Sequence, residues 1–251
     1  MTTPDLPAFF RLVSHQQIDS TNEEAKKLAA AGAPDGTVVW ALEQLAGKGR
    51  RGRRFQSPPG NLYATFLLRP ICPPAIGAQV TFVAAIAAAE TAAGLLPPAR
   101  LVQLKWPNDL LIDGRKVAGI LLEASAEPER LQWLVVGIGI NVRHSPLELR
   151  EVATSLRDAG ATDATVETVL ERLAERLLEW YRRWQADGFA PVRTRWLGLA
   201  RGLGEAIEVR LDDRAIHGRF ADLDDTGSLV LELPRGGRQL ISAGDVFYRG
   251  H

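Results

Sequence analysis

Two kinds of hydrophobic pattern alternate along the chain and predict which segments are strands and which are helices. Continuous apolar runs rich in β-branched and aromatic residues predict strands, and they occupy residues 37–43, 61–68 and 131–142. Apolar residues at helical spacing predict helices, which cover residues 20–31, 79–93 and 166–187. Because helices and strands intermingle, we expect an α+β fold with a mixed β-sheet and flanking helices.

Turn and cap residues define the ends of several elements. Ser20 and Glu23 have the spacing of a capping box at the start of the first helix. Residues 102–125 read as a strand, a proline-containing turn and a hairpin. The hairpin turn is Asp113-Gly114, which is a strong signal for a type I′ turn.

The pattern changes after about residue 200. Short apolar segments separated by turn residues follow one another at 205–211, 215–223, 228–233 and 238–242. Such a run of short strands is typical of a small β-barrel. We therefore divide the chain into a first domain, 1–199, and a small C-terminal β-barrel domain, 200–251.

Composition narrows the class of protein. The chain has 251 residues, with 46% apolar and 24% charged residues, which is ordinary for a globular protein. Its 30 basic and 30 acidic residues cancel, so net charge gives no case for binding nucleic acid or a membrane. The single cysteine, Cys72, forms no internal disulfide, and no signal-like segment begins the chain, so we expect a cytoplasmic protein. The longest apolar run, from Val80, is too short and too rich in alanine to span a bilayer.

The stretch GKGRRGR, Gly47–Arg53, concentrates glycine and positive charge in one place. Its glycines match the spacing G-x-G-x-x-G of a dinucleotide-binding loop, but that loop must open a helix. Here Pro58-Pro59-Gly60 follows and forbids a helix, so we exclude a Rossmann site. No G-x-x-x-x-G-K-[ST] sequence occurs, which excludes a P-loop.

Three interpretations of this loop remain. It could be a solvated surface loop, a contact for nucleic acid, or a lid that closes over a compact polyanion such as a nucleotide phosphate. A nucleic-acid contact would favour cations spread over a face and a net positive charge. The cations are instead concentrated between two predicted strands, which favours a single small site.

Several motifs occur in an order that resembles the biotin protein ligase family: DSTNEEA, EQLAGKGRRGR, KWPNDLL, GRKVAGILLE and VVGIGINV. The resemblance covers nearly the whole chain and implies a class II synthetase-like catalytic domain followed by an SH3-like β-barrel. Repressor-type members of the family carry an N-terminal DNA-binding domain. Only 18 residues precede DSTN here, so we expect the monofunctional ligase, with no DNA partner.

The resemblance also implies a reaction. Biotin and ATP, with Mg²⁺, form biotinyl-5′-AMP, and biotin then passes to a lysine of the biotin carboxyl carrier protein of acetyl-CoA carboxylase. Cations must offset the repulsion between a carboxylate and ATP, and the mixed anhydride must be kept from water. A cationic, glycine-rich loop meets both needs. No membrane partner is expected, and the oligomeric state is open between a monomer and a homodimer.

The resemblance assigns biotin-binding roles to residues in these motifs: Ser20, Thr21, Asn22, Gln44, Lys48, Gly49, Arg50, Lys116 and Gly119. Ser20 has helix capping as an alternative role, and Lys116 could be an exposed lysine beside a hairpin turn. Family members commonly have arginine where this chain has Lys48. Lysine keeps the charge but loses the planar fork of arginine.

Catalytic and nucleotide-binding roles follow from the same resemblance. Arg50, Lys116, Asp109 and Lys105 are the catalytic candidates; Asp109 would orient the acceptor lysine or bind Mg²⁺, although turn formation explains it equally well. The nucleotide-binding candidates are Arg50, Arg53, Phe55, Lys105 and Asn141. Phe55 would lie beside the adenine, at a position where the family often has tryptophan.

Other chemistries find little support. The chain's 4 histidines are scattered without metal-ligand spacing, so we assign no metal-ligating residues. Within the same fold, a lipoate ligase or an octanoyl transferase is the nearest alternative. From another class, a nucleic-acid-binding protein that uses the arginine loop remains open; its affinity would fall steeply with salt.

Overall fold

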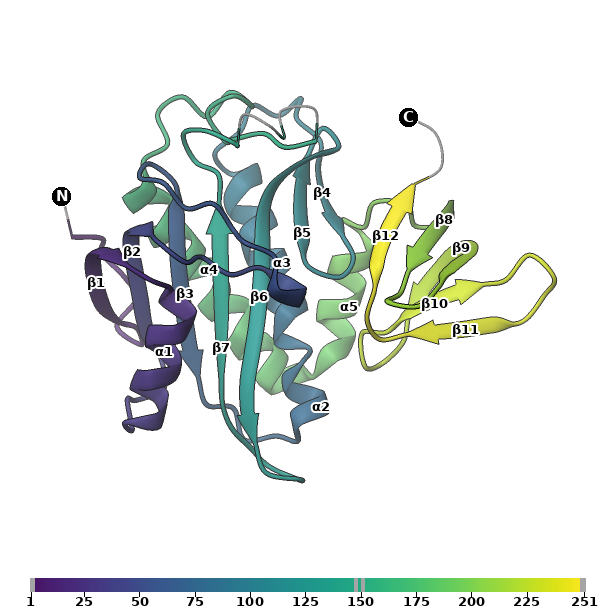
Figure 1. Ribbon diagram of the computed structural model, residues 1–251, viewed down its shortest axis with the longest axis horizontal. Coiled ribbons are helices and arrows are strands. Elements are labelled where there is room, and N and C mark those ends of the chain that lie inside the picture. Colours follow the sequence, from purple (N-terminus) through teal and green to yellow (C-terminus); the bar gives the residue numbers. More distant parts are fainter. Residues whose placement is uncertain (1–2, 147–148, 150–151, 249–251) are drawn as a thin grey trace.

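The larger sheet of the molecule is mixed, as the sequence predicts. The computed structural model describes residues 3–146, 149 and 152–248. The strands of this sheet are β1 (Arg11–Ile18), β2 (Thr37–Gln44), β3 (Leu62–Leu68), β4 (Val102–Lys105), β5 (Asp109–Ile112), β6 (Arg115–Ala126) and β7 (Leu131–Ile140). Seven strands lie in the order β1-β2-β3-β7-β6-β5-β4 (Figure 1). β1 runs parallel to β2, whereas the other neighbours are antiparallel.

Helices cover both faces of this sheet. They are α1 (Thr21–Ala30), α2 (Pro74–Gly77), α3 (Val80–Ala93), α4 (Val166–Asp187) and α5 (Phe189–Leu197), with a short 3₁₀ helix, η1 (Arg50–Gly52). α3 and α4 lie on one face and α1 on the other (Figure 1). The three predicted helices are confirmed, and Thr165 caps α4 in a capping box with Thr168. β1, α2 and α5 were not predicted from the sequence.

Side-chain alternation gives the two faces of the sheet different characters. In β7, Val136, Ile138 and Ile140 belong to the main core, together with the buried residues of α3 and α4. The alternate positions face the other way, Gly137 toward Asn22 at the start of α1 and Gly139 toward Phe55 of the loop between β2 and β3. One face of the sheet therefore holds the core, and the other is left hollow beside α1.

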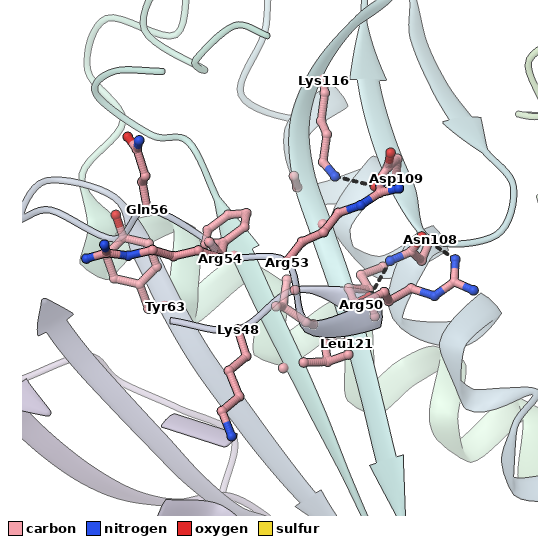
Figure 2. A pocket seen from close by; sticks show the side chains of 18 of the residues that line it. Lys48, Arg50, Arg53, Arg54, Gln56, Tyr63, Asn108, Asp109, Lys116 and Leu121 are labelled. Atoms are coloured by element: carbon pink, nitrogen blue, oxygen red, sulfur yellow. Dashed lines mark hydrogen bonds and ion pairs between the residues drawn. The ribbon is translucent and has the colours of Figure 1, made fainter. Parts of the chain in front are cut away.

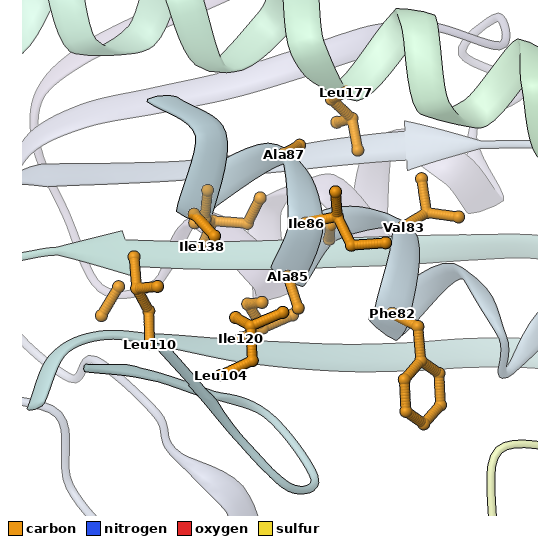
Figure 3. Packing of buried hydrophobic residues seen from close by; sticks show 14 of the residues in the cluster. Phe82, Val83, Ala85, Ile86, Ala87, Leu104, Leu110, Ile120, Ile138 and Leu177 are labelled. Atoms are coloured by element: carbon orange, nitrogen blue, oxygen red, sulfur yellow. The ribbon is translucent and has the colours of Figure 1, made fainter. Parts of the chain in front are cut away.

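The helical segment formed by α2 and α3 begins earlier in the chain than the helix predicted for residues 79–93. Among the described residues, Pro74–Ala93 is long and apolar enough to meet the length and composition criteria for a membrane span, although 72% of the apolar window is buried inside the protein. The apolar run from Val80 was expected to be too short to span a bilayer. That expectation did not include α2, which extends the apolar helical segment to Pro74. Figure 3 shows side chains of α3, such as Ile86, packed among core residues of the sheet, such as Ile138. This segment accordingly serves as the core helix of the larger sheet.

The C-terminal region forms a second, antiparallel sheet. Its strands are β8 (Ala206–Arg210), β9 (Ala215–Leu223), β10 (Leu229–Glu232), β11 (Arg238–Ile241) and β12 (Asp245–Tyr248). They lie in the order β11-β10-β9-β8-β12, and β12 was not foreseen from the sequence. The expected small second β-structure is confirmed, while the strand pairs between described residues form an open series, so closure into a barrel stays a prediction.

Aromatic residues join the two sheets through one continuous core. The Phe82 ring of α3 contacts the rings of Phe189 and Trp196, with centroids 5.4 and 5.5 Å away. Trp196 in turn meets Phe220 of β9 at 6.4 Å. The indole nitrogen of Trp106 donates a hydrogen bond of 3.2 Å to the Gly227 carbonyl in the β9–β10 turn. These contacts hold the C-terminal sheet against α3, α5 and the turn between the edge strand β4 and its neighbour β5.

Candidate functional site

A cavity of about 340 Å³ lies on the hollow face of the larger sheet. Its walls are the N-terminus of α1, the loop between β2 and β3, the start of β5, and strands β6 and β7 (Figure 2). The sequence-predicted residues that line it are Ser20, Thr21, Asn22, Gln44, Lys48, Gly49, Arg50, Arg53, Phe55, Asp109, Lys116, Gly119 and Asn141. Segments separated by more than a hundred residues thus meet around one space of a size suited to a small ligand.

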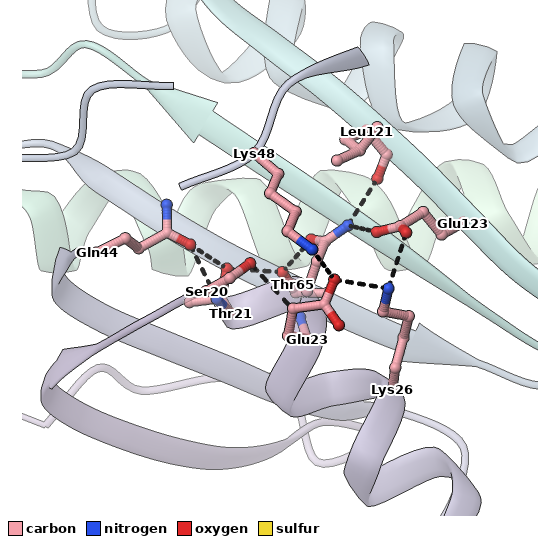
Figure 4. Close-up of polar contacts among 10 residues, drawn as sticks. Ser20, Thr21, Glu23, Lys26, Gln44, Lys48, Thr65, Leu121 and Glu123 are labelled. Carbon is pink, nitrogen blue, oxygen red and sulfur yellow. Dashed lines mark hydrogen bonds and ion pairs between the residues drawn. The ribbon is translucent and has the colours of Figure 1, made fainter. Parts of the chain in front are cut away.

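Uncharged polar side chains form one end of the cavity (Figure 4). The Gln44 side-chain oxygen accepts hydrogen bonds from the Thr21 backbone N–H at 2.8 Å and the Thr21 hydroxyl at 3.0 Å. The Thr65 hydroxyl lies 2.9 Å from Thr21 Oγ1 and 2.7 Å from Asn22 Oδ1. Ser20 caps α1, with Oγ at 3.5 Å from the Glu23 N–H, and also lines the cavity. Both roles proposed for Ser20 are therefore compatible with its position.

An ionic network holds this polar end in place from the outside. Asn22 Nδ2 donates to a Glu123 carboxylate oxygen at 2.9 Å, and the other oxygen of Glu123 accepts from Lys26 at 2.9 Å. Lys26 also contacts Glu23 at 2.7 Å, and Lys48 of the β2–β3 loop contacts Glu23 at 2.6 Å. Hydrogen bonds from Lys26 and Lys48 hold the pKa of Glu23 below its usual value. The network ties the β2–β3 loop to α1.

Glycines of β6 and β7 make room for side chains of the site. A Cβ at Gly137 would overlap the Asn22 carboxamide, and one at Gly139 would lie 2.7 Å from the Phe55 ring. A Cβ at Gly119 would sit 3.4 Å from Lys116 Nζ. Gly137 and Gly139 therefore accommodate the protein's own binding-site side chains. The Gly119 distance is an ordinary contact, so the predicted close approach of a ligand to Gly119 stays a prediction.

The basic loop folds as a tight turn over the cavity. The Gly49 N–H donates to the Arg53 carbonyl at 2.7 Å, and the Phe55 N–H donates to the Gly47 carbonyl at 2.9 Å. Within it, η1 contains Arg51 at φ 55°, in the left-handed region that most side chains avoid. The backbone thereby presents cations on more than one side of the turn.

The cations of this loop have different partners. Lys48 pairs with Glu23, and Arg53 pairs with Asp245 of β12 at 2.6 Å. Arg51 lies 3.4 Å from Asp212 and 3.7 Å from Asp245. Arg50 donates instead to the amide oxygen of Asn108 at 3.2 Å. The loop is consequently bound to α1, to the start of β5 and to the C-terminal sheet.

Half-buried Arg50 faces the cavity without a carboxylate in direct contact among the residues that the structure describes. Its pKa is lowered, chiefly because burial removes water from the guanidinium, while Asp245 and Asp109 oppose that effect from farther away. The guanidinium stays charged because its reference pKa is so high. An anion in the cavity would offset this loss of hydration.

Charged residues also approach the cavity from β5 and β6. Lys116 Nζ lies 2.5 Å from Asp109 Oδ1 across the hairpin whose turn is Asp113-Gly114. Both turn residues have positive φ, 50° and 78°, as the predicted type I′ turn requires. Asn141, buried at the end of β7, donates to the Thr154 carbonyl at 3.0 Å. Asp109 and Lys116 are thus brought together as a pair.

Lys105 is the exception among the predicted residues, because the cavity lining does not include it. Its ammonium group lies over the rings of Phe247 and Tyr248, 5.4 and 6.0 Å from their centroids. Burial lowers the pKa of Lys105, while the charge of Asp109 acts in the opposite direction. Its direct contacts are with β12, and the catalytic and nucleotide-binding roles of Lys105 stay a prediction.

Several residues of the site were missed from the sequence. Those that line the cavity or hold its walls are Tyr63, Thr65, Asn108, Glu123 and Asp245. Asn108 stands inside the motif KWPNDLL and could have been singled out from it. Thr65 is a polar residue inside an apolar strand, which is a signal in itself. Asp245 lies in a strand that had not been predicted, and nothing local marked it.

Fold and cavity together define an α+β protein with a small-molecule site, polar at one end and cationic at the other. Residues 54–198 match the biotin/lipoate A/B protein ligase family, and residues 202–249 match the biotin protein ligase C-terminal domain. The chain belongs to the biotin/lipoate A/B protein ligase family.

Similar proteins include ligases that match most of this chain. The biotin–[acetyl-CoA-carboxylase] ligase of Paracoccus denitrificans is 40% identical over 92% of this chain and 98% of the relative. The bifunctional ligase/repressor BirA of Bacillus subtilis is 36% identical over 92% of this chain and 72% of that protein. A solved structure of biotin protein ligase from Aquifex aeolicus, in complex with biotin and ATP, superimposes with a TM-score of 0.79 at 28% identity, covering 94% and 97% of the two chains.

Proposed function

We propose that the protein is an ATP-dependent biotin–[acetyl-CoA-carboxylase] ligase. It forms biotinyl-5′-AMP and pyrophosphate from biotin and ATP, and then transfers biotin to a lysine of the biotin carboxyl carrier domain of the carboxylase, releasing AMP. The observation that carries the proposal is one cavity with an uncharged hydrogen-bonding end and a cationic end under a single loop. The carboxylase as acceptor is supported by the names of the relatives.

The polar end is suited to the ureido ring of biotin. Ser20, Thr21, Asn22 and Gln44 offer neutral donors and acceptors whose orientation is set by their mutual hydrogen bonds. A rigid, prearranged set of this kind favours a polar ring over a flexible acyl chain, because a chain would leave the buried polar atoms without partners. This contrast favours biotin over lipoate or octanoate.

The cationic end is suited to the first chemical step. The biotin carboxylate attacks the α-phosphorus of ATP, a bond to the bridging oxygen breaks, and pyrophosphate leaves. Lys48, Arg50 and Lys116 offset the repulsion between the carboxylate and the triphosphate, with Gly49 giving the loop backbone close approach. Arg53, Phe55 and Asn141 are assigned to the nucleotide, with the Phe55 ring beside the base.

Asp109 is assigned to the second step. A protonated lysine cannot attack the mixed anhydride, so the acceptor amine needs a proton acceptor nearby. The Asp109 carboxylate lines the cavity and is held by Lys116 at 2.5 Å. Once Lys116 contacts the adenylate, the carboxylate is released to orient the incoming amine. Lys105 keeps its predicted catalytic and nucleotide-binding role, with its ammonium group lying over two rings of β12.

Mg²⁺ is assigned to the triphosphate rather than to a protein cage. Among the described residues no group of three or more His, Cys, Asp or Glu side chains is placed to hold a metal ion. Magnesium commonly binds through substrate phosphates and one or two carboxylates, and among the described residues the carboxylates of Asp109 and Asp245 line the cavity. The ion would neutralise part of the negative charge of the phosphates.

Further proposals concern the setting of the enzyme. We assign catalysis to residues 1–199, with 200–251 as an accessory domain that holds the basic loop through Asp245. We also propose a cytoplasmic enzyme, without a DNA or membrane partner, as a monomer or a homodimer. The Paracoccus relative, of which the chain covers 98%, is named as a ligase alone.

A pyrophosphate-release assay with biotin, lipoate and octanoate in parallel tests the function. With MgATP, we expect release with biotin at a rate at least about tenfold above either acid, because unpaired polar groups penalise the wrong ligand. Faster release with lipoate, or none with any acid, would refute the proposal. Tight, salt-dependent binding of the chain to DNA or RNA would favour the nucleic-acid alternative.

A further inference from the structure

Asn108 occupies a junction between the basic loop and the sheet. It precedes β5, and it is fixed to β6 by two hydrogen bonds: its Nδ2 donates to the Ile120 carbonyl at 2.6 Å, and its own carbonyl accepts from the Ile120 N–H at 3.0 Å. The remaining side-chain atom, Oδ1, accepts the hydrogen bond from Arg50 at 3.2 Å (Figure 2). One rigidly held amide oxygen therefore receives the guanidinium.

The chemistry of this partner sets Arg50 apart from most cations of the loop. Lys48, Arg51 and Arg53 each pair with a carboxylate, whereas Arg50 has an amide oxygen and Arg54 the backbone carbonyl of Leu45. An amide oxygen can orient a guanidinium through a hydrogen bond, but it does not cancel the positive charge. A carboxylate in the same place would form a charge-assisted, bidentate pair and compete with a phosphate. The described contacts therefore leave Arg50 oriented and still charged.

We propose that Asn108 is a positioning residue that aims Arg50 at the adenylate phosphate without neutralising it. The proposal rests on the proposed ligase function and adds a specific role within it. Asn108 acts through Arg50, because Nδ2 and the backbone carbonyl are already engaged with β6 and only Oδ1 faces the loop. The loop is thus set for anion binding before any ligand arrives.

A double-mutant cycle on retention of biotinyl-5′-AMP tests the coupling. The four proteins are wild type, Asn108→Ala, Arg50→Gly and the double variant, and the measured quantity is the rate of release of purified biotinyl-5′-AMP. We expect Asn108→Ala to speed release about 2- to 10-fold, the effect of one hydrogen bond. In the Arg50→Gly background the same substitution should change release less than about twofold, because its target is already gone.

Asn141 supplies the matched control. It is also a cavity-lining asparagine whose amide donates to a backbone carbonyl, here that of Thr154 at 3.0 Å, so this side-chain contact is not with the basic loop. We expect Asn141→Ala to have the same effect in both backgrounds. Equal effects in the two backgrounds are additive. If Asn108 had only a structural role, Asn108→Ala would be additive as well.

The outcomes separate the two proposals. If wild-type protein binds biotinyl-5′-AMP and the Asn108 cycle is additive, the positioning role is wrong and the ligase function stands. If wild-type protein binds no biotinyl-5′-AMP, the ligase function fails and the role of Asn108 fails with it. A third variant, Asn108→Asp, should release the adenylate faster than wild type, because a carboxylate would pair with Arg50; tighter retention would contradict the proposal.

Discussion

Gly137 shows how a missing side chain shapes the binding site. It lies in β7 between Thr65 of β3 and Leu121 of β6, on the face opposite the main core. The space that its Cβ would take is occupied by the carboxamide of Asn22, which reaches over to Thr65 and Glu123. Position 137 therefore controls the polar end of the cavity.

We predict that Gly137→Ala weakens biotin binding. The new methyl group would displace Asn22 from its hydrogen bonds, since the strand backbone of a central β-strand cannot move freely. Loss of one or two hydrogen bonds to the ligand corresponds to an increase in Kd of about 10- to 100-fold. Isothermal titration with biotin measures this change directly.

A substitution on the other face of β7 controls for a general loss of stability. Val136→Ala removes apolar volume from the main core, where Val136 is fully buried. It should lower the free energy of unfolding by roughly 1–3 kcal/mol while leaving the Kd for biotin unchanged. Biotin affinity that falls equally in both variants would argue against a specific role for the Gly137 position.

At the scale of single residues, the sequence motifs predicted which residues lie together. They did not predict the contacts that hold those residues in place. Ser20, Thr21, Asn22 and Gln44 were recognised by resemblance and do line one cavity. Their partner Thr65 was not, because its significance depends on which strand pairs with β7. The contacts of Lys105 with β12 were not foreseen for a related reason, because the local pattern did not reveal that strand.

At the scale of elements, alternation along the strands separates core from site. The strands β3, β6 and β7 place most of their large apolar residues in the main core with α3 and α4, and place Thr65, Gly119, Gly137 and Gly139 on the opposite side. Strong patterns such as 61–68 and 131–142 made these strands predictable from the sequence. The ends of the predicted helices also held, because Thr165 and Gly188 carry specific cap chemistry.

The elements missed from the sequence share a physical cause. β1 is an edge strand whose residues are largely polar and at most partly buried, so its sequence RLVSHQQI lacks a clear period. β12 has four residues and is also an edge strand. Both are specified by pairing with a neighbour rather than by their own pattern. Edge position, which depends on the whole sheet, is not readable from such short segments.

At the scale of the whole molecule, the C-terminal sheet is coupled to the site through a shared core and through the basic loop. The turn that contains Gly227 presses on Phe82 of α3 and accepts the hydrogen bond from Trp106. On the cavity side, Asp245 of β12 pairs with Arg51 and Arg53. Movement of this sheet would therefore alter the position of the loop.

Gly227→Ala is predicted to loosen this interface. At φ +88° any Cβ is strained, and here it would also overlap the Phe82 ring. We expect a loss of about 2–4 kcal/mol in the free energy of unfolding, the sum of backbone strain and overpacking, measured by denaturant unfolding. Gly236→Ala is a matched control, because Gly236 has φ +88° with nothing within 4 Å of the added Cβ.

The comparison between these two variants isolates the contact with Phe82. Gly236→Ala should cost only the strain, about 1–2 kcal/mol, and should leave adenylate retention as in wild type. Gly227→Ala should in addition speed adenylate release, since the loop loses its support. Equal stability and equal retention in the two variants would show that the interface has no influence on the loop.

The central claim is that the cationic loop holds an activated, anionic intermediate in the cavity until an acceptor amine arrives. The most direct measurement is the release of biotinyl-5′-AMP from Arg50→Gly, followed by labelling of lysines on a bystander protein. Loss of a charge-assisted contact should speed release about 10- to 100-fold, and the escaped adenylate should label the bystander. An Arg50→Gly protein that retains the adenylate as long as wild type, and labels only the carrier domain, would contradict the account.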